Sequence, residues 1–165
     1  MINEVIKKGS EDIVTLGTAD IEELLRIARK SKLNRARYVM HRTNQDAVQE
    51  MIIALTHQVY IKPHKHLNKM ESFFIIEGNL SIVFFDDAGV KIDVVELDAS
   101  KNLKPVYYRM NKPMWHTVVV HSDFAVILET TTGPFKKSET EFAEWAPEEF
   151  ENDKISNFIE SLGLN

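Results

Sequence analysis

The stretch of sequence that decides the fold is Pro63-His64-Lys65-His66-Leu67-Asn68-Lys69-Met70-Glu71, which is followed by Gly78. If this piece is extended, successive side chains alternate between two faces, so His64 and His66 point the same way. Pro63 and the apolar, β-rich run 72–77 favour an extended segment over a helix. The carboxylate of Glu71 follows a short polar break and can return to the face that carries both imidazoles.

A third imidazole is available in Lys112-Pro113-Met114-Trp115-His116. Neutral imidazoles and one carboxylate suit a divalent first-row transition metal, and Fe, Mn, Ni, Co and Zn all fit. The chain has no cysteine, so any metal must use nitrogen and oxygen donors. We therefore expect one metal with open coordination positions, whose ligands are His64, His66, Glu71 and His116.

The spacing His64-x-His66-x4-Glu71-x6-Gly78 resembles the first motif of the cupins, and Pro113-x-x-His116 resembles the core of their second motif. The sequence departs from these motifs at Gln58, which stands in place of the opening glycine, and at Val120, which stands in place of an asparagine. The similarity is closer to the metal-binding cupins of the WbuC type, which are encoded among bacterial surface-polysaccharide (O-antigen) genes. The pieces that carry it are 48–51, 63–66, 85–89, 115–117, Glu129, 133–135 and 145–148.

The resemblance implies an all-β dominated, cupin-like double-stranded β-helix, or jelly-roll barrel, with an N-terminal and a C-terminal helix. Within this single domain we expect an arm and helix at 1–33, the barrel at 34–135, and a loop and helix packed on the barrel at 136–165. The resemblance also implies a metal and a homodimer, with residues 1–17 as an exchange arm. It does not imply a known reaction.

Composition limits the classes of function. The 165 residues suffice for one domain with a sizeable core, and the net charge of -5 argues against binding to nucleic acid or to an anionic membrane. The start, Met1-Ile2-Asn3-Glu4, lacks the basic segment and apolar core of a signal peptide, so we expect a cytoplasmic protein. No apolar run approaches the roughly 20 residues of a membrane span.

Periodicity predicts the remaining elements. Apolar residues spaced as on a helix predict one helix at 20–30 and another at 147–162, while 46–55 fits a helix or a strand and the resemblance favours a strand. Gly78-Asn79 predicts a hairpin between 73–76 and 80–85. Further strands are expected at 12–16, 59–61, 90–97, 103–110, 115–120 and 124–130, with a loop at 135–146 and with Pro105 indicating an edge.

Several other residues are candidates for binding or catalysis. Arg35 and Arg37 lie in the most basic patch and could hold a phosphate, because guanidinium groups match phosphate oxygens, or they could be ordinary surface residues. His41 and Tyr60 are candidate acid–base groups, and alternation places Tyr60 on the face of His64 and His66. Trp115 and Arg109 could line a substrate pocket, although strand aromatics are more often core residues.

Three functions follow from this pattern. The first is a metal-dependent enzyme acting on a sugar or nucleotide-sugar, an isomerase or epimerase in which the metal polarises a carbonyl or binds hydroxyls. The second is an Fe-dependent dioxygenase, since other cupins use the same ligands for oxygen chemistry. The third is a non-catalytic, metal-assisted sugar-binding module. Each needs a small-molecule ligand and a divalent metal.

Overall fold

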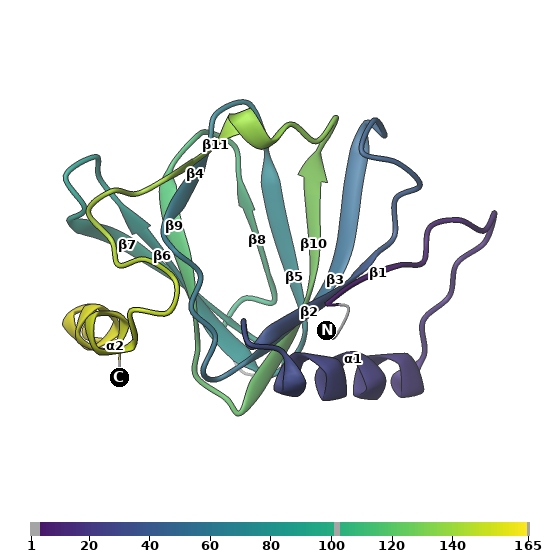
Figure 1. Ribbon diagram of the computed structural model, residues 1–165, viewed down its shortest axis with the longest axis horizontal. Coiled ribbons are helices and arrows are strands. Elements are labelled where there is room, and N and C mark those ends of the chain that lie inside the picture. The colour runs from purple at the N-terminus through teal and green to yellow at the C-terminus, as the bar shows by residue number, and fades with distance from the viewer. Residues whose placement is uncertain (1–3, 101–102, 165) are drawn as a thin grey trace.

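Two β-sheets face each other and form the body of the protein (Figure 1). The computed structural model describes residues 4–100 and 103–164. In the described chain, one sheet has six strands in the order β1-β2-β3-β10-β5-β8, and the other has five in the order β11-β4-β9-β6-β7. All pairings are antiparallel except the parallel pair of β1 and β2. The expected all-β, jelly-roll class is confirmed.

The strand and helix bounds complete the description. The six-stranded sheet contains β1 Val5–Lys7, β2 Arg35–Val39, β3 Val48–Thr56, β5 Glu71–Glu77, β8 Tyr107–Met110 and β10 Phe124–Thr132. The five-stranded sheet contains β4 His64–His66, β6 Asn79–Phe85, β7 Lys91–Asp98, β9 Trp115–Val120 and β11 Thr140–Phe142. The helices are α1 Thr18–Lys30, α2 Asn152–Ser161 and a 3-10 turn, η1, Lys137–Glu139.

The main apolar core fills only part of the space between the sheets. It joins the inward side chains of β5, β8 and β10 to those of β6, β7 and β9, and includes Phe73, Ile75, Leu80, Ile82 and Ile127. Farther along β2 and β3, inward side chains such as Arg35, Arg37 and Gln49 line a cavity together with His64 and His66 of β4. The fold therefore leaves a cavity on the β2–β3 side.

Each helix covers an outer face of a sheet (Figure 1). Helix α1 packs Leu24, Leu25 and Ala28 against the outward side chains of β2 and β3. Its first turn starts at Thr18, two residues before the predicted Asp20, because the Asp20 carboxylate accepts a 3.0 Å hydrogen bond from the Gly17 N–H. Helix α2 and the segment before it cover the outward side chains of β6, including Val83 and Phe85.

The predicted hairpin around Gly78-Asn79 is wrong. Strands β5 and β6 are consecutive but belong to different sheets, so Gly78 carries the chain from one sheet to the other. Its φ of 77° lies in the left-handed region, and a Cβ there would lie 2.1 Å from the Phe124 carbonyl oxygen. A hairpin turn and a crossing turn share this glycine signal, which is why the sequence did not distinguish them.

Five other local predictions need correction. No strand forms at 12–16 or 59–61, and the N-terminal strand in the described chain is β1. The strand expected at 103–110 starts at Tyr107, although it is an edge strand as Pro105 indicated. The helix expected at 147–162 starts at Asn152, after Phe150 adopts a positive φ of 75°. The loop at 135–146 contains β11, which pairs with β4.

The close approach at Gly78 gives a test of the fold. We expect Gly78→Ala to lower the free energy of unfolding by about 2 kcal/mol or more, because it adds a backbone clash to an unfavourable φ. The control is Gly163→Ala, where φ is 60° but nothing lies within 4 Å of the added Cβ. Urea denaturation followed by circular dichroism measures both. Equal losses in the two variants would contradict a tight crossing at Gly78.

Candidate metal centre

The four predicted ligands come together where the two sheets meet. His64 and His66 lie on β4, and His64 is the direct cross-strand partner of His116 on β9. Glu71 starts β5 in the opposite sheet. One donor atom from each of the four side chains lies within 4.8 Å of the other three. Ligands facing each other across an ion would be about 4.2 Å apart, so small movements suffice to bind one.

Backbone contacts fix the orientation of two of the imidazoles. Nδ1 of His64 donates to the Lys62 carbonyl oxygen at 3.1 Å, and Nδ1 of His116 donates to the Met114 carbonyl oxygen at 2.9 Å. In the neutral ring this places the proton on Nδ1 and leaves the lone pair on Nε2. His66 follows the same orientation, with Nδ1 at 3.1 Å from Thr140 Oγ1. The outer contacts therefore direct Nε2 of each ring inward.

Glu71 is the anionic centre of the cluster. Its side chain is 2% exposed, with Oε2 at 3.2 Å from Nε2 of His66 and Oε1 at 3.4 Å from Nε2 of His116. The Tyr108 hydroxyl donates to Oε1 as well. Burial opposes ionisation, but the charge of His116 and the hydrogen bonds outweigh it and hold the pKa of Glu71 well below its usual range. The site is therefore built around a buried carboxylate anion.

The two buried imidazoles respond differently to this carboxylate. Burial opposes protonation of His116, but the neighbouring Glu71 outweighs it and raises the pKa of His116. Burial, aided by His116, lowers the pKa of His64 to about 3. A neutral His64 at pH 7 is the form that a metal requires, and binding would displace any proton from His116.

The donor set fits a metal. Nε2 of His116 is fully buried and makes no hydrogen bond of good geometry with the described residues, which leaves a lone pair directed into the cluster. Three imidazoles and one carboxylate are suitable ligands for a divalent transition metal. The cluster is therefore a candidate metal site between the two sheets of the jelly roll.

The cluster lies in the wall of a cavity of about 1170 Å³. The inward side chains of β2, β3, β5 and β10 form one wall, and His64, His66 and His116 form the facing one. Segment 148–150 contributes further lining residues, and two ion pairs bind it to the barrel: Arg35–Glu149 at 3.0 Å and Lys62–Glu148 at 2.5 Å. The cavity exceeds the usual size of a small-molecule pocket.

Three of the other candidate residues line this cavity. They are Arg35, Arg37 and His41, so the basic patch predicted from sequence faces the cavity. Burial lowers the pKa of Arg37, and the interaction with Glu129 acts in the opposite direction. Nδ1 of His41 lies 3.2 Å from the backbone of Glu50, which leaves its other ring nitrogen for a ligand.

The remaining three candidates lie away from the lining. The Tyr60 hydroxyl donates to the Pro147 carbonyl oxygen at 2.8 Å, and its ring packs against Phe158. Trp115 alternates with the inward His116, so it faces outward, where its Nε1 donates to Asp87. Arg109 lies on the exposed face of edge strand β8 and donates to Asn111. The expected alternation for Tyr60 fails because residues 59–63 are not a strand.

Sequence reasoning did not assign a site role to Glu129 or Lys69. Glu129 lies on β10 directly opposite Phe73 of β5, and lines the cavity. Burial, and then the charge of Glu71, raise the pKa of Glu129 to about 8. The sequence does offer one indication of a role for Glu129, because it is a single glutamate within the apolar strand 124–130. A carboxyl group in such a strand is costly to bury, so its presence indicates a binding or catalytic role.

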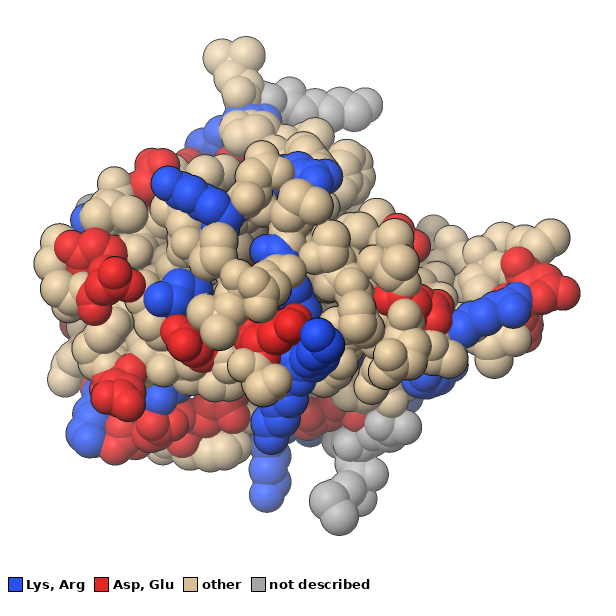
Figure 2. Space-filling view, turned by 90° about the horizontal axis from the view of Figure 1, so that it is seen from above, with Lys and Arg blue, Asp and Glu red and all other residues tan. Residues whose placement is uncertain are grey.

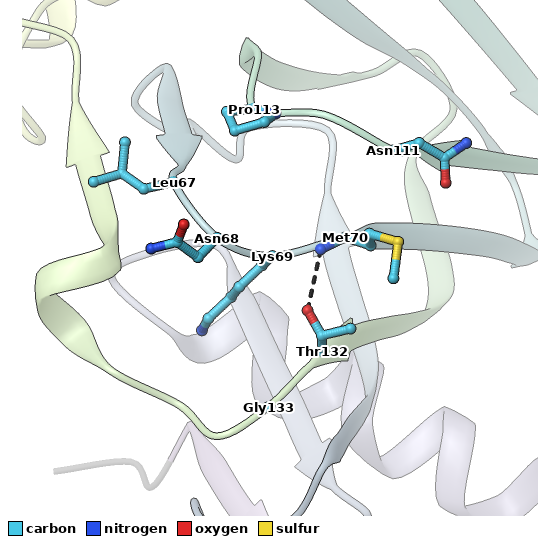
Figure 3. Close-up of a pocket in the computed structure, with 8 residues that line it drawn as sticks. All are labelled: Leu67, Asn68, Lys69, Met70, Asn111, Pro113, Thr132 and Gly133. Carbon is cyan, nitrogen blue, oxygen red and sulfur yellow. Dashed lines mark hydrogen bonds between the residues drawn. The ribbon is translucent and has the colours of Figure 1, made fainter.

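A smaller hollow of about 360 Å³ lies beside the metal ligands, between the β4–β5 loop and the end of β10 (Figure 3). Met70 N–H donates to Thr132 Oγ1 across it at 3.1 Å. Its lining includes Lys69, which also lines the large cavity. Lys69 therefore borders both spaces.

On the face of the molecule seen from above, the charges do not form a patch of one sign (Figure 2). Seen from above, Lys and Arg side chains are interspersed with Asp and Glu (Figure 2). Neither α1 nor α2, the α-helices of the described residues, is long and apolar enough to span a bilayer.

Comparisons with known proteins support the fold. A family model described as a domain of unknown function (DUF6016) matches residues 16–97. Protein SO0799 from Shewanella oneidensis aligns with a TM-score of 0.59 at 11% identity, over 78% of this chain and 85% of that one. CapF, a capsular polysaccharide assembling protein from Staphylococcus aureus, aligns with a TM-score of 0.51 at 17% identity, over 67% of this chain and 31% of that one. The search of curated proteins gave no match.

At these identities the structural neighbours establish the fold alone. CapF has the cupin fold, and the present chain shares its arrangement over about a third of CapF's length. The chain therefore has a cupin-like jelly-roll fold that carries a candidate metal site of three histidines and one glutamate.

The raised pKa of Glu129 predicts a pH-dependent effect on stability. A carboxyl group whose folded pKa is about 8 favours folding below its unfolded pKa of about 4.5, and this contribution is lost as pH rises toward 8. We therefore expect Glu129→Gln to stabilise the metal-free protein by about 4 kcal/mol at pH 8 and by less than about 1 kcal/mol at pH 4.5. Urea denaturation across this range tests it. A pH-independent difference would contradict a proton held on Glu129.

Proposed function

We propose that His64, His66, Glu71 and His116 hold one divalent first-row transition metal, and that the protein acts on a sugar or nucleotide-sugar in bacterial polysaccharide biosynthesis. The reaction is an isomerisation or epimerisation that depends on Lewis-acid chemistry. The observation that carries this proposal is the convergence of four donor atoms in the wall of a large cavity. A structural metal would not need such a cavity beside it.

Two similarities and the size of the cavity favour a sugar or nucleotide-sugar as the ligand. The sequence resembles WbuC-type cupins of surface-polysaccharide gene clusters, and CapF, which has the same fold, is a capsular polysaccharide assembling protein. The cavity of about 1170 Å³ has room for a nucleotide-sugar. Polar and charged side chains line it beside apolar ones, as recognition of a hydroxylated ligand requires.

The bound metal would supply a Lewis acid that polarises a carbonyl or neighbouring hydroxyl oxygens of the ligand. Arg35 and Arg37 would bind phosphate oxygens of the ligand from the opposite wall. His41 would hold or accept a proton through the ring nitrogen that faces away from Glu50. Tyr60 is a poorer base, because burial raises its pKa and its hydroxyl already donates to Pro147.

A cytoplasmic homodimer remains part of the proposal. The N-terminal strand β1 pairs with β2 of its own chain, so an exchanged arm is not required to complete the sheet. Outward apolar side chains Phe74 and Tyr107 are cross-strand partners near the edge strand β8, and they offer a surface for a second copy. Light scattering at several protein concentrations measures the oligomeric state.

Elemental analysis tests the metal site. We expect about one divalent metal per chain in the untagged protein, and a large loss in His64→Ala and in His116→Ala, because each variant removes an inward Nε2 donor. The matched control is His57→Ala, which removes an exposed histidine outside the cluster and should leave the metal content unchanged. Wild-type protein that stays metal-free after reconstitution would refute the metal proposal.

The same preparations separate the alternative functions. Conversion of a sugar or nucleotide-sugar that stops in His116→Ala would support the isomerase or epimerase proposal. Binding of the sugar without turnover would indicate the metal-assisted binding module. Iron as the resident metal, together with oxygen uptake on adding substrate, would indicate the dioxygenase.

A further inference from the structure

Lys69 is a buried lysine directed into the cavity. Its side chain is 6% exposed, and it lines both the large cavity and the smaller hollow beside it. It stands two residues before the ligand Glu71, in the loop between β4 and β5. Figure 3 shows its side chain pointing away from Pro113 and Asn111. One short loop therefore brings an ammonium group close to the metal ligands.

The ammonium of Lys69 has no ordinary polar partner among the described residues. Its Nζ lies 4.6 Å from the centroid of the Phe135 ring, and no described carboxylate oxygen is within 4.0 Å. The acidic side chains that act electrostatically on Lys69 are Glu139, Glu129 and Glu71. Glu139 is paired with Lys136, and Glu71 is occupied by the two histidines and Tyr108. The contact with the Phe135 ring offsets only part of the free-energy cost of burying the ammonium group.

We infer that Lys69 binds an anionic oxygen group, a carboxylate or a phosphate, of the same ligand that reaches the metal. The inference rests on the proposed function, since it concerns the same cavity, and it narrows the ligand class to anions. A sugar acid or a sugar phosphate has this chemistry: hydroxyl or carbonyl oxygens for the metal, and a charged group for the lysine. The Phe135 ring lies beside the ammonium, with Nζ 4.6 Å from the ring centroid, and leaves its remaining hydrogen-bond capacity for the ligand.

The test is calorimetric titration of the metal-loaded and the metal-free protein with inorganic phosphate and with glycolate. We expect wild type to bind at least one of the two, and Lys69→Met to weaken that binding by about tenfold or more, since it removes a charge-assisted contact. Lys69→Arg, which keeps the charge, should retain most of the affinity. Lys112→Met, which removes an exposed lysine, is the control and should bind as wild type does.

A purely structural role for Lys69 gives a different result. If the lysine only ties its loop to Phe135, then Phe135→Leu will weaken anion binding as much as Lys69→Met, and Lys69→Arg will not differ from Lys69→Met. That pattern would overturn the inference, as would equal affinities in wild type and Lys69→Met, or no binding of either probe by wild type. Thermal melts of each variant verify that it is folded.

The design also keeps this inference separate from the metal proposal. Metal content is measured on every preparation, and Lys69→Met should keep its metal because all four ligands remain. If wild type holds no metal but binds an anion through Lys69, the metal proposal fails and the anion site stands. Preference for phosphate over glycolate would indicate a phosphorylated ligand, and the reverse preference a carboxylic acid.

Discussion

A buried carboxylate with three polar partners is the constraint on which the centre of this protein depends. Glu71 begins a strand of one sheet, and its oxygens face histidines that belong to the other sheet. Such a charge is costly in the interior unless its partners are held in place. The carbonyl oxygens of Lys62 and Met114 fix two of the imidazoles, and Thr140 lies against the third. The contacts between the two sheets are therefore polar around Glu71 and apolar in the main core.

The distribution of apolar residues explains why a cavity exists beside this link. Side chains such as Ile75, Ile82 and Ile127 close the barrel on one side. The inward positions of β2, by contrast, alternate Arg35 and Arg37 with outward core residues. Guanidinium groups cannot be packed into a dry core without partners, so this side of the barrel stays open to ligand or water. The same residues that prevent close packing supply the polar wall of the cavity.

The sequence predicted those features that depend on the spacing of residues within a short segment. The His-x-His spacing, with its carboxylate and distant third histidine, found the four clustered residues, because alternation on a strand fixes which way side chains face. The sequence did not predict correctly which strands pair or where each strand begins and ends. Gly78 indicates a left-handed turn, but it does not indicate whether the chain crosses from one sheet to the other. The side-chain direction predicted for Tyr60 was wrong because its segment is not a strand. Lys69 could not be found, since a lysine in a polar loop is usually exposed.

The order of the ligands along the chain has a consequence for how the protein matures. Two histidines and the glutamate lie in adjacent segments, but His116 arrives only when β9 pairs with β4 and β6. A nascent or partly folded chain holds only part of the donor set, with the two sheets not yet joined at this point. High-affinity loading should therefore report complete assembly of the barrel, and in a cell it would favour the finished molecule over its incomplete forms.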